Sequence, residues 1–312
     1  MIEIKKITKK FGDFTAVNDL TFSIKPGEVV GFLGPNGAGK STTMKMITGF
    51  LPIDSGEITV AGLNIEDSPI EVKQILGYLP EGAPAYSDMT VAQFLNFIAD
   101  VRGLTGRKKK ARLARVIKSV ELADVLDRTI ENLSKGFKRR VGLAQAIIHD
   151  PDVLILDEPT DGLDPNQKHQ VRALIQNLAK DKIVIVSTHI LEEVTAVCNR
   201  AIIIAKGNKI FDGTPDELQA KSSFHHAVTI ELDEAVDSTE ALENLTEVKS
   251  VSVEDKRVTV MPEQGQVIFD KVYQTVNSLG WKFNAIYSEK GRLDDIFREL
   301  TDHELAGSTS TH

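Results

Sequence analysis

The segment Gly34-Pro-Asn-Gly-Ala-Gly-Lys40-Ser41 has the residue types and the spacing that bind phosphate groups. It matches the pattern G-x-x-x-x-G-K-[ST] at every fixed position. An apolar run at 28–33 reads as a buried strand before it, and a helix is expected to open at Ser41, so backbone N–H groups converge on the phosphates. We expect Lys40 to reach the β- and γ-phosphates and Ser41 to ligate Mg²⁺. A plain glycine-rich turn is the alternative, and the four matched residues in this context make it the less favoured one.

A second set of chemical groups is the pair Asp157 and Glu158, which closes the apolar run at 153–156. One carboxylate at the end of a buried strand can hold the shell of a metal ion while its neighbour polarises water. A structural salt bridge is the alternative, but two adjacent carboxylates are costly to bury without a metal. The pair therefore favours hydrolysis of a magnesium-bound nucleotide.

The length and charge limit the classes of protein to consider. At 312 residues, one large domain plus a smaller one is expected. The 37 basic and 45 acidic residues give a net charge of -8, so we expect no nucleic-acid partner. Cys198 is the only cysteine, which excludes an internal disulfide, fits a reducing cytosol and favours a packing role.

Membrane insertion is not expected from the sequence. No stretch approaches the roughly 20 continuous apolar residues of a membrane-spanning helix. The first residues, Met-Ile-Glu-Ile-Lys-Lys, alternate like a strand and lack the apolar core of a signal peptide, so no secretion is expected. Any membrane role must then come through a partner.

The elements that must position these groups form an alternating pattern. Strands are expected at 2–7, 15–24, 28–33 and 57–60, and again at 153–156, 183–186 and 201–205. Helices are expected at 90–101, 108–120 and 166–179, with 85–150 as a mainly helical subdomain. Alternation of strands and helices implies an α/β fold with a mainly parallel sheet core, preceded by an antiparallel β part.

A smaller α+β domain is expected after the linker. Thr214-Pro-Asp-Glu217 is a capping box with proline at the first helical position. Beyond it, strands and helices follow in the split β-α-β-β-α-β order of a ferredoxin-like domain, with strands at 227–232, 248–253, 257–261 and 282–287. We expect domains at 1–218 and 219–304, a last helix at 293–300, and a disordered tail at 305–312.

In order, the phosphate loop at Gly34, the segment Leu133-Ser-Lys-Gly-Phe137 and the Asp157-Glu158 pair make the chain resemble the ATPase subunit of an ABC transporter. The resemblance covers residues 1–218 and implies a P-loop NTPase fold of ABC type. It also implies two ATPase subunits that face head to tail, either two copies or two homologues. Each nucleotide would lie between the phosphate loop of one subunit and the signature segment of the other.

The same resemblance implies roles for single residues. Glu158 would be the catalytic base, and His189 would contact the γ-phosphate and orient water. Mg²⁺ would be held by Ser41, Glu81 and Asp157. Residues implied to bind ATP are Phe11, Val17, Gly34, Pro35, Asn36, Gly37, Ala38, Gly39, Lys40, Ser41 and Thr42 of one subunit, with Ser134, Gly136 and Asp164 of the opposite one.

Four positions differ from the family pattern. Phe11 stands where a tyrosine usually stacks on adenine; a phenyl ring keeps the π face, and a core aromatic is the alternative. The signature carries Lys135 and Phe137 instead of glycine and glutamine, and Lys135 could lie near the phosphate or point to solvent. Glu81 replaces a glutamine that senses the membrane partner, and its carboxylate can still ligate the metal.

The resemblance also indicates a partner. The segment 81–90 would contact a separate transmembrane permease, which would hold the chain in the cytoplasm at the inner face of the cell membrane. The stretch 144–151 and the end 293–300 are similar to ATPases of multidrug, polysaccharide and gliding-motility exporters, which favours export. The transported substrate is not encoded in any residue that we identify.

Two other functions remain open. One is a non-transport ABC ATPase that acts on a macromolecular complex. The other is a phosphate-loop kinase, which gives the signature segment and Asp164 no role.

The basic run at 107–112 could approach anionic lipids, although a solvated helix face is favoured. The domain at 219–304 could regulate activity, support dimerisation or cover a sheet edge.

Overall fold

The computed structural model describes residues 1–82, 85–236, 238–292 and 295–297. The chain divides into two compact units, Met1–Gly213 and Thr214–His312. The boundary expected from the sequence, at 218, falls five residues later, within the second unit. The expected tail at 305–312 and most of the expected helix at 293–300 lie outside the described residues.

The first unit begins with an antiparallel sheet of order β2-β1-β4-β5. Its strands are β1 (Ile2–Phe11), β2 (Phe14–Ile24), β4 (Ser55–Val60) and β5 (Leu63–Asn64). Alternation in β1 puts Ile2 and Ile4 into the core, since successive side chains of a strand point to opposite faces. The predicted N-terminal antiparallel β part is therefore confirmed.

The second sheet of this unit has the order β10-β9-β3-β8-β7-β6. Its strands are β3 (Val29–Leu33), β6 (Leu76–Leu79), β7 (Val153–Asp157), β8 (Ile183–Thr188), β9 (Arg200–Ala205) and β10 (Asn208–Gly213). All neighbours pair in parallel except β9 and β10. Every residue of β3, β7 and β8 is buried, because helices cover both faces of a parallel sheet.

Register places the turns after these strands at one edge. Leu33 pairs with Thr188, and Asp157 pairs with Ser187. Since the strands are parallel, their carboxyl ends meet there, and ligands of such folds bind outside those ends. The phosphate loop, the Asp157-Glu158 pair and the His189 turn all follow strands that end at this edge.

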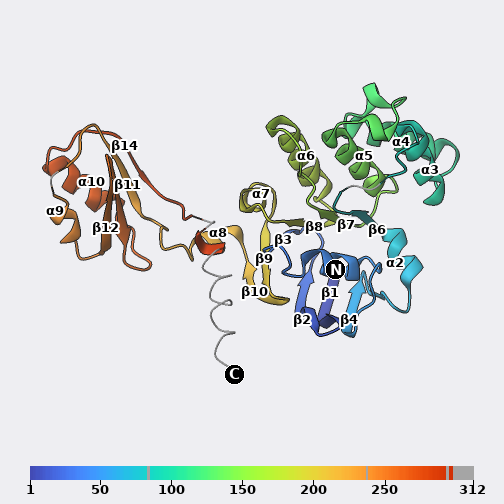
Figure 1. Cartoon of the computed structure of the whole chain (residues 1–312), viewed down its shortest axis with the longest axis horizontal. Coiled ribbons are helices and arrows are strands. Elements are labelled where there is room, and N and C mark those ends of the chain that lie inside the picture. Colours follow the sequence, from blue (N-terminus) through green and yellow to red (C-terminus); the bar gives the residue numbers. More distant parts are fainter. Residues whose placement is uncertain (83–84, 237, 293–294, 298–312) are drawn as a thin grey trace. The chain divides into compact units, whose positions relative to one another are not determined.

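Helices connect these strands. They are α1 (Lys40–Ile47), α2 (Pro69–Ile75), α6 (Pro165–Leu178) and α7 (Leu191–Val197). Between β6 and β7 lie α3 (Val91–Val101), α4 (Gly106–Ser119), the 3₁₀ turns η1 (Ala123–Val125) and η2 (Ile130–Asn132), and α5 (Lys135–Ile147). Figure 1 shows α3, α4 and α5 gathered beside β6. A capping box at Thr90 and Gln93 fixes the start of α3.

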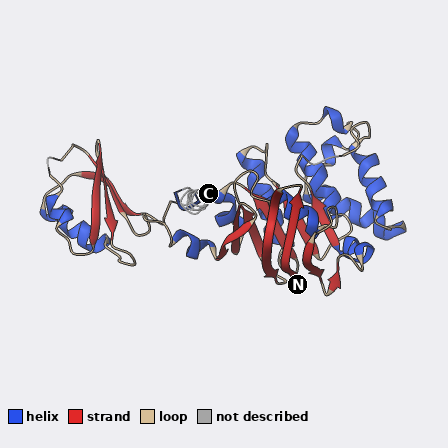
Figure 2. Ribbon diagram, turned by 60° about the horizontal axis from the view of Figure 1, so that its bottom comes forward, coloured by secondary structure: helices blue, strands red, loops and turns tan. Residues whose placement is uncertain are grey.

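The second unit opens with α8 (Pro215–Gln219), whose Thr214 and Glu217 form the expected capping box. Its sheet has the order β12-β13-β11-β14, antiparallel throughout. The elements are β11 (Val228–Leu232), α9 (Glu240–Glu243), β12 (Val248–Glu254), β13 (Arg257–Pro262), α10 (Phe269–Ser278) and β14 (Phe283–Ser288). Figure 2 shows both helices on one face of this sheet, which is the ferredoxin-like arrangement.

Among the helices of the described residues, none combines the length and the apolar character needed to cross a membrane.

Candidate active site

The phosphate loop joins β3 to α1 through backbone that favours glycine. Gly37 has φ 81° and Gly39 has φ 103°, in the left-handed region. A Cβ at Gly39 would also collide with the carbonyl oxygen of Ala16. The Lys40 ammonium donates to the carbonyl oxygens of Gly34 at 2.7 Å and Pro35 at 3.2 Å. An ammonium has three donors, so the third can serve a phosphate oxygen.

The turn between β9 and β10 is hydrogen-bonded to the phosphate loop. The Gly207 N–H donates to the Ala38 carbonyl at 3.0 Å, and the Asn18 N–H donates to the Gly207 carbonyl at 3.0 Å. Val17 is fully buried, and its Cγ2 would lie 3.2 Å from a Cβ at Gly39. The sequence did not single out Gly207, whose contact partners lie about 170 to 190 positions away in the chain.

Phe11 lies at the end of β1, opposite Phe14, and 50% of its surface is exposed. The Lys9 ammonium lies 5.8 Å from the centroid of its ring. The structure therefore excludes the alternative that Phe11 is a core aromatic. The contacts of Phe11 and Val17 with adenine stay predictions.

Asp157 and Glu158 stand at the end of β7 with different surroundings. Asp157 is the last strand residue and is 2% exposed. Glu158 has φ 50°, a left-handed conformation that is uncommon for a residue with a Cβ. Its N–H donates to the Ser187 carbonyl at 2.8 Å, which anchors the turn to β8. The backbone therefore turns the Glu158 side chain out of the strand.

His189 and Thr188 hold the carboxylate of Glu158. His189 Nδ1 lies 2.8 Å from Glu158 Oε1, and the Thr188 hydroxyl donates to Glu158 Oε2 at 3.3 Å. The sequence-predicted pair Glu158 and His189 is thus in direct contact. This arrangement orients a carboxylate for accepting a proton, as a general base requires.

Electrostatic coupling links these carboxylates to the phosphate loop. Burial lowers the pKa of Lys40, whereas the charges of Glu158, Asp157 and Glu81 oppose that shift. The pKa of Tyr78 in β6 is raised to about 12 by burial, then by Asp157 and Glu81. Carboxylates from two distant parts of the sequence, 81 and 157–158, therefore act on one cation, Lys40.

The donor set at this edge fits Mg²⁺. Ser41, second residue of α1, offers a hydroxyl, and Asp157 and Glu81 offer carboxylates, which are the hard oxygen ligands that this ion prefers. Within the described residues, no cluster of three or more His, Cys, Asp or Glu side chains could hold a metal ion. Mg²⁺ commonly binds through one or two carboxylates together with phosphate oxygens.

The signature segment and the segment at 161–164 lie side by side. Ser134 caps α5, and its hydroxyl oxygen accepts from the Phe137 N–H at 3.4 Å. Asp164 caps α6 by accepting from the Gln167 N–H at 2.9 Å. A Cβ at Gly136 would lie 2.5 Å from Gln167 Oε1, so α5 and the start of α6 approach closely here. Ser134 and Asp164 are exposed, whereas Gly136 is buried beside Gln167 of α6.

The two substitutions in the signature segment have different surroundings. Lys135 is exposed. Phe137 is half-buried, and the Arg140 guanidinium lies 5.7 Å from its ring centroid. Phe137 thus has a local packing role within α5.

Two charged residues of the site were missed from the sequence. Arg139 of α5 is buried and donates to the carbonyl oxygens of Pro80, Asp157 and Glu158. The sequence feature that could have identified Arg139 is its helical spacing. It is a basic residue on the buried stripe of α5, between Gly136 and Leu143. Glu193 of α7 is also buried, in an apolar stripe with Val194. Both would have been found as charges at positions where the period calls for apolar residues.

Comparisons with known proteins agree with this geometry. The family model described as "ABC transporter" matches residues 17–161. Nod factor export ATP-binding protein I of Paraburkholderia xenovorans is 32% identical over 305 residues, which cover 97% of this chain and 98% of that protein. Linearmycin resistance ATP-binding protein LnrL of Bacillus subtilis is 39% identical over 219 residues, which cover 70% of each chain.

A further relative is longer than this chain. The "Probable multidrug ABC transporter ATP-binding protein YbhF" of Escherichia coli is 40% identical over 224 residues, which cover 72% of this chain. The match spans 39% of the length of that relative.

Solved structures are similar to the first part of the chain. One described as the ATP-binding subunit of an ABC transporter has a TM-score of 0.66 and 30% identity, and the match covers 70% of this chain and 92% of that one. A dimeric ATP-binding cassette with ADP and Pi has a TM-score of 0.64 at 23% identity, with 69% and 99% coverage. The latter likeness shows the fold alone.

Proposed function

The chain belongs to the ABC transporter family, and on that premise we propose that it binds and hydrolyses ATP to drive a separate membrane permease. The observation that carries the proposal is the contact between His189 and Glu158 at the strand edge that also bears Lys40. A phosphate loop, a buried acidic strand end and an oriented carboxylate are the parts that phosphoryl transfer to water needs.

In the proposed mechanism, the N–H groups of the loop and the Lys40 ammonium bind the phosphates. Ser41, Asp157 and Glu81 are the residues that would hold Mg²⁺, which supplies positive charge to the β- and γ-phosphate oxygens. The Glu158 carboxylate accepts the proton of a water molecule as the water oxygen attacks the γ-phosphorus. The bond from the γ-phosphorus to the bridging oxygen breaks, and ADP leaves with that oxygen. His189 holds that carboxylate and faces the γ-phosphate.

A second subunit completes the site in this proposal. Ser134 and Gly136 offer a hydroxyl and a backbone N–H to a γ-phosphate bound by another copy of the chain or by a homologous subunit. Asp164 accepts from the N–H of Gln167, whose side chain lies close to Gly136, and this proximity supports a shared role. ATP-dependent closure of the two subunits would then move the permease.

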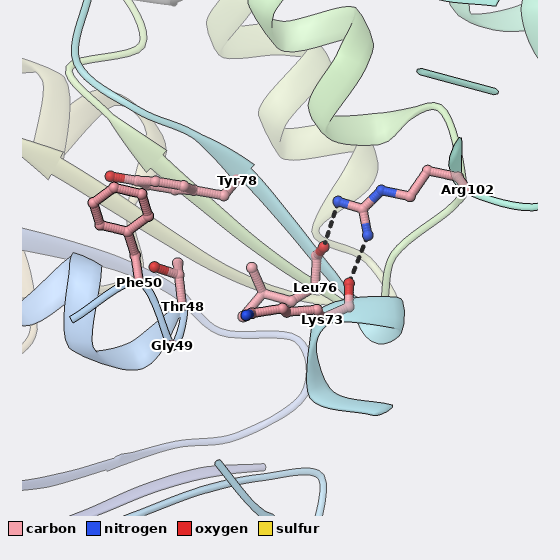
Figure 3. Close-up of a pocket in the computed structure, with 7 residues that line it drawn as sticks. All are labelled: Thr48, Gly49, Phe50, Lys73, Leu76, Tyr78 and Arg102. Atoms are coloured by element: carbon pink, nitrogen blue, oxygen red, sulfur yellow. Dashed lines mark hydrogen bonds between the residues drawn. The ribbon is translucent and has the colours of Figure 1, made fainter. Parts of the chain in front are cut away.

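A cavity in the first unit supports contact with a membrane partner. It has a volume of about 420 Å³ and lies between the end of α1 and the end of α3 (Figure 3). Phe50 lines it and is 77% exposed. Arg102 lines it too and donates to the carbonyl oxygens of Lys73 at 2.6 Å and Leu76 at 3.4 Å. We assign this cavity and the segment 81–90 to the permease.

Export is the proposed direction of transport. The relatives named above are a multidrug, a Nod factor export and a resistance ATP-binding protein. Through its permease, the chain would be held at the cytoplasmic face of the membrane. In this proposal, residues 1–218 form the ATPase domain with its helical subdomain at 85–150, and residues 219–304 form the accessory domain.

The substitution Glu158→Gln tests this function. It removes the proton acceptor but keeps the shape of the side chain, so the rate of ATP hydrolysis should fall by about 10²- to 10⁴-fold. Binding of MgATP should persist, and size-exclusion chromatography with MgATP should show a trapped dimer. The measurements are phosphate release and nucleotide binding on the full chain.

The matched control is Glu192→Gln, because Glu192 is exposed on α7 and lies outside the site. This variant should hydrolyse ATP at the wild-type rate. Normal turnover by Glu158→Gln would refute the assignment of the base. If the wild-type chain neither bound nor hydrolysed ATP, with or without its permease, the proposed function itself would be wrong.

A further inference from the structure

Glu193 of α7 is a buried carboxylate with an unusual number of partners. It is 3% exposed, and a buried charge is stable only when it is well paired. Its Oε1 accepts a hydrogen bond from the Thr160 hydroxyl, and its Oε2 accepts one from Thr188 at 3.4 Å. The cations of Lys168 and Arg172 lie 3.7 and 3.8 Å from Oε1. Each oxygen therefore has a different set of partners.

The two hydroxyl partners belong to the two turns that form the site. Thr160 lies two residues after Glu158, in the turn that follows β7. Thr188 ends β8 and directly precedes His189. One carboxylate thus joins the turn that carries Glu158 to the turn that carries its holding histidine.

Thr188 links Glu193 still more directly to the base. Its hydroxyl lies within hydrogen-bond distance of Glu158 Oε2, at 3.3 Å, and of Glu193 Oε2, at 3.4 Å. A hydroxyl has one hydrogen, so it donates to one of these carboxylates at a time. The oxygen of Thr188 also accepts from the Ile190 N–H at 3.1 Å, which fixes its position. Glu193 therefore competes with Glu158 for this single donor.

We propose that Glu193 is a positioning residue for hydrolysis, an inference that rests on the proposed ATPase function. Its carboxylate fixes the two turns against each other and keeps the 2.8 Å contact between His189 and Glu158. Lys168 and Arg172 compensate its charge and connect both turns to α6, which begins after Asp164.

The first test is Glu193→Gln in the full chain, compared with Glu192→Gln on the same helix. The amide keeps the size of the side chain but loses the charge and part of the accepting capacity. Because small misplacements of catalytic groups are costly, kcat should fall by about 10- to 100-fold. The KM for ATP should stay within about twofold, because the four partners of Glu193 described above all lie outside the phosphate loop. Glu192→Gln should match the wild type in both constants.

A second pair of variants separates positioning from general stability. Thr160→Val and Thr188→Val each remove one hydroxyl partner of Glu193, and each should lower kcat with little change in KM. If Glu193 acts through Thr188, the kcat of the double variant Thr188→Val/Glu193→Gln should be no lower than that of the more impaired single variant. These variants also keep the proposal testable if Glu193→Gln does not fold.

Several outcomes would overturn the role of Glu193. The first is a wild-type kcat in Glu193→Gln, and the second is a raised KM with unchanged kcat in that variant. The third is a double variant, Thr188→Val/Glu193→Gln, in which the two single losses of kcat multiply. In each case the wild-type chain still hydrolyses ATP and Glu158→Gln still abolishes turnover, so the proposed function would survive. Failure of the wild-type chain to hydrolyse ATP would remove both.

Discussion

At the scale of single residues, backbone oxygens organise the site as much as acidic side chains do. The Arg139 guanidinium has five N–H donors in a rigid fork, and it donates to the carbonyl oxygens of Pro80, Asp157 and Glu158. Burial lowers its pKa, while the charge of Asp157 opposes this shift most strongly. Arg139 therefore fixes the turn after β7 from the side of α5.

Cys198 gives a prediction at the same scale. Its thiol is buried behind α7, and burial, with a smaller contribution from Glu193, raises its pKa to about 12. The thiolate is the reactive form, so the native protein should react with a thiol reagent at pH 8 far more slowly than the denatured protein does. Timed labelling with and without denaturant measures this difference.

Cys198→Ala supplies the control, because Cys198 is the only cysteine and its loss should abolish all labelling. Native labelling as fast as that of the denatured chain would show that the thiol is accessible and contradict the packing role.

At the scale of elements, the start of β6 is the point where the helical subdomain is fastened to the sheet. The Leu76 carbonyl accepts from Arg102, at the end of α3, and from His149, which follows α5. Arg102 also donates to Lys73 of α2. One carbonyl thus receives donors that follow the first and the last helix of the inserted segment, next to the cavity assigned to the permease.

His149 makes the stability of this contact between the helical subdomain and the sheet dependent on pH. Burial, then the charge of Arg102, lowers its pKa to about 4, below the value of about 6.5 in an unfolded chain. Between these values the unfolded state binds more protons, so stability is complete above pH 6.5 and falls as the pH drops toward 4. The contribution is at most about 1.4 kcal/mol per pH unit.

Urea unfolding at pH 7 and pH 5 measures this effect. His149→Gln keeps a donor for the Leu76 carbonyl but does not titrate, so its stability should fall less between the two pH values than that of the wild type. Equal losses in both proteins would show that His149 does not contribute to the acid sensitivity.

The elements also show what sequence can and cannot predict. The buried runs at β3, β7 and β8 were predicted because both faces of a parallel strand are covered, which leaves a continuous apolar signal. By contrast, α2 and β6 were not predicted. The helix has no side-chain cap bond at Ser68, and the four-residue strand follows it directly. Strand β6 depends on pairing with β7, about 75 positions later, and no local pattern encodes that.

The candidate site divides in the same way. Lys40, Asp157 and Glu158 stand in short motifs whose chemistry is local, so their types and spacing were informative. Arg139 and Glu193 act through contacts between turns that are distant in sequence, and only the folded chain shows those partners.

At the scale of the whole molecule, each unit has a hydrophobic core of its own. The core of the second unit is made by Val228, Ile230, Leu232, Leu242, Val258, Val260, Ile268, Val272 and Val276. These residues come from the sheet and from both helices. The two units therefore have separate sources of stability.

Calorimetry of the full chain should accordingly show two unfolding transitions. MgATP at 100 times its Kd should stabilise the first unit alone, by about 2.7 kcal/mol. Val272→Ala opens a cavity in the core of the second unit and should destabilise that unit by on the order of 2 kcal/mol. It should therefore lower the temperature of the second unit's transition only. Val267→Ala, at an exposed position, is the control and should shift neither. A single unfolding transition whose temperature shifts both with MgATP and with Val272→Ala would show that the two units do not unfold independently.

The left-handed backbone of Glu158 has a consequence for how this position can vary. Glycine and asparagine suit that conformation better than glutamate does, and β-branched residues suit it worst. A library randomised at this codon would therefore separate two criteria. Screening for soluble expression would enrich residues that relax the turn, whereas screening for turnover would recover glutamate. In the proposed function, glutamate at this position would serve hydrolysis although other residues suit the backbone of the turn better.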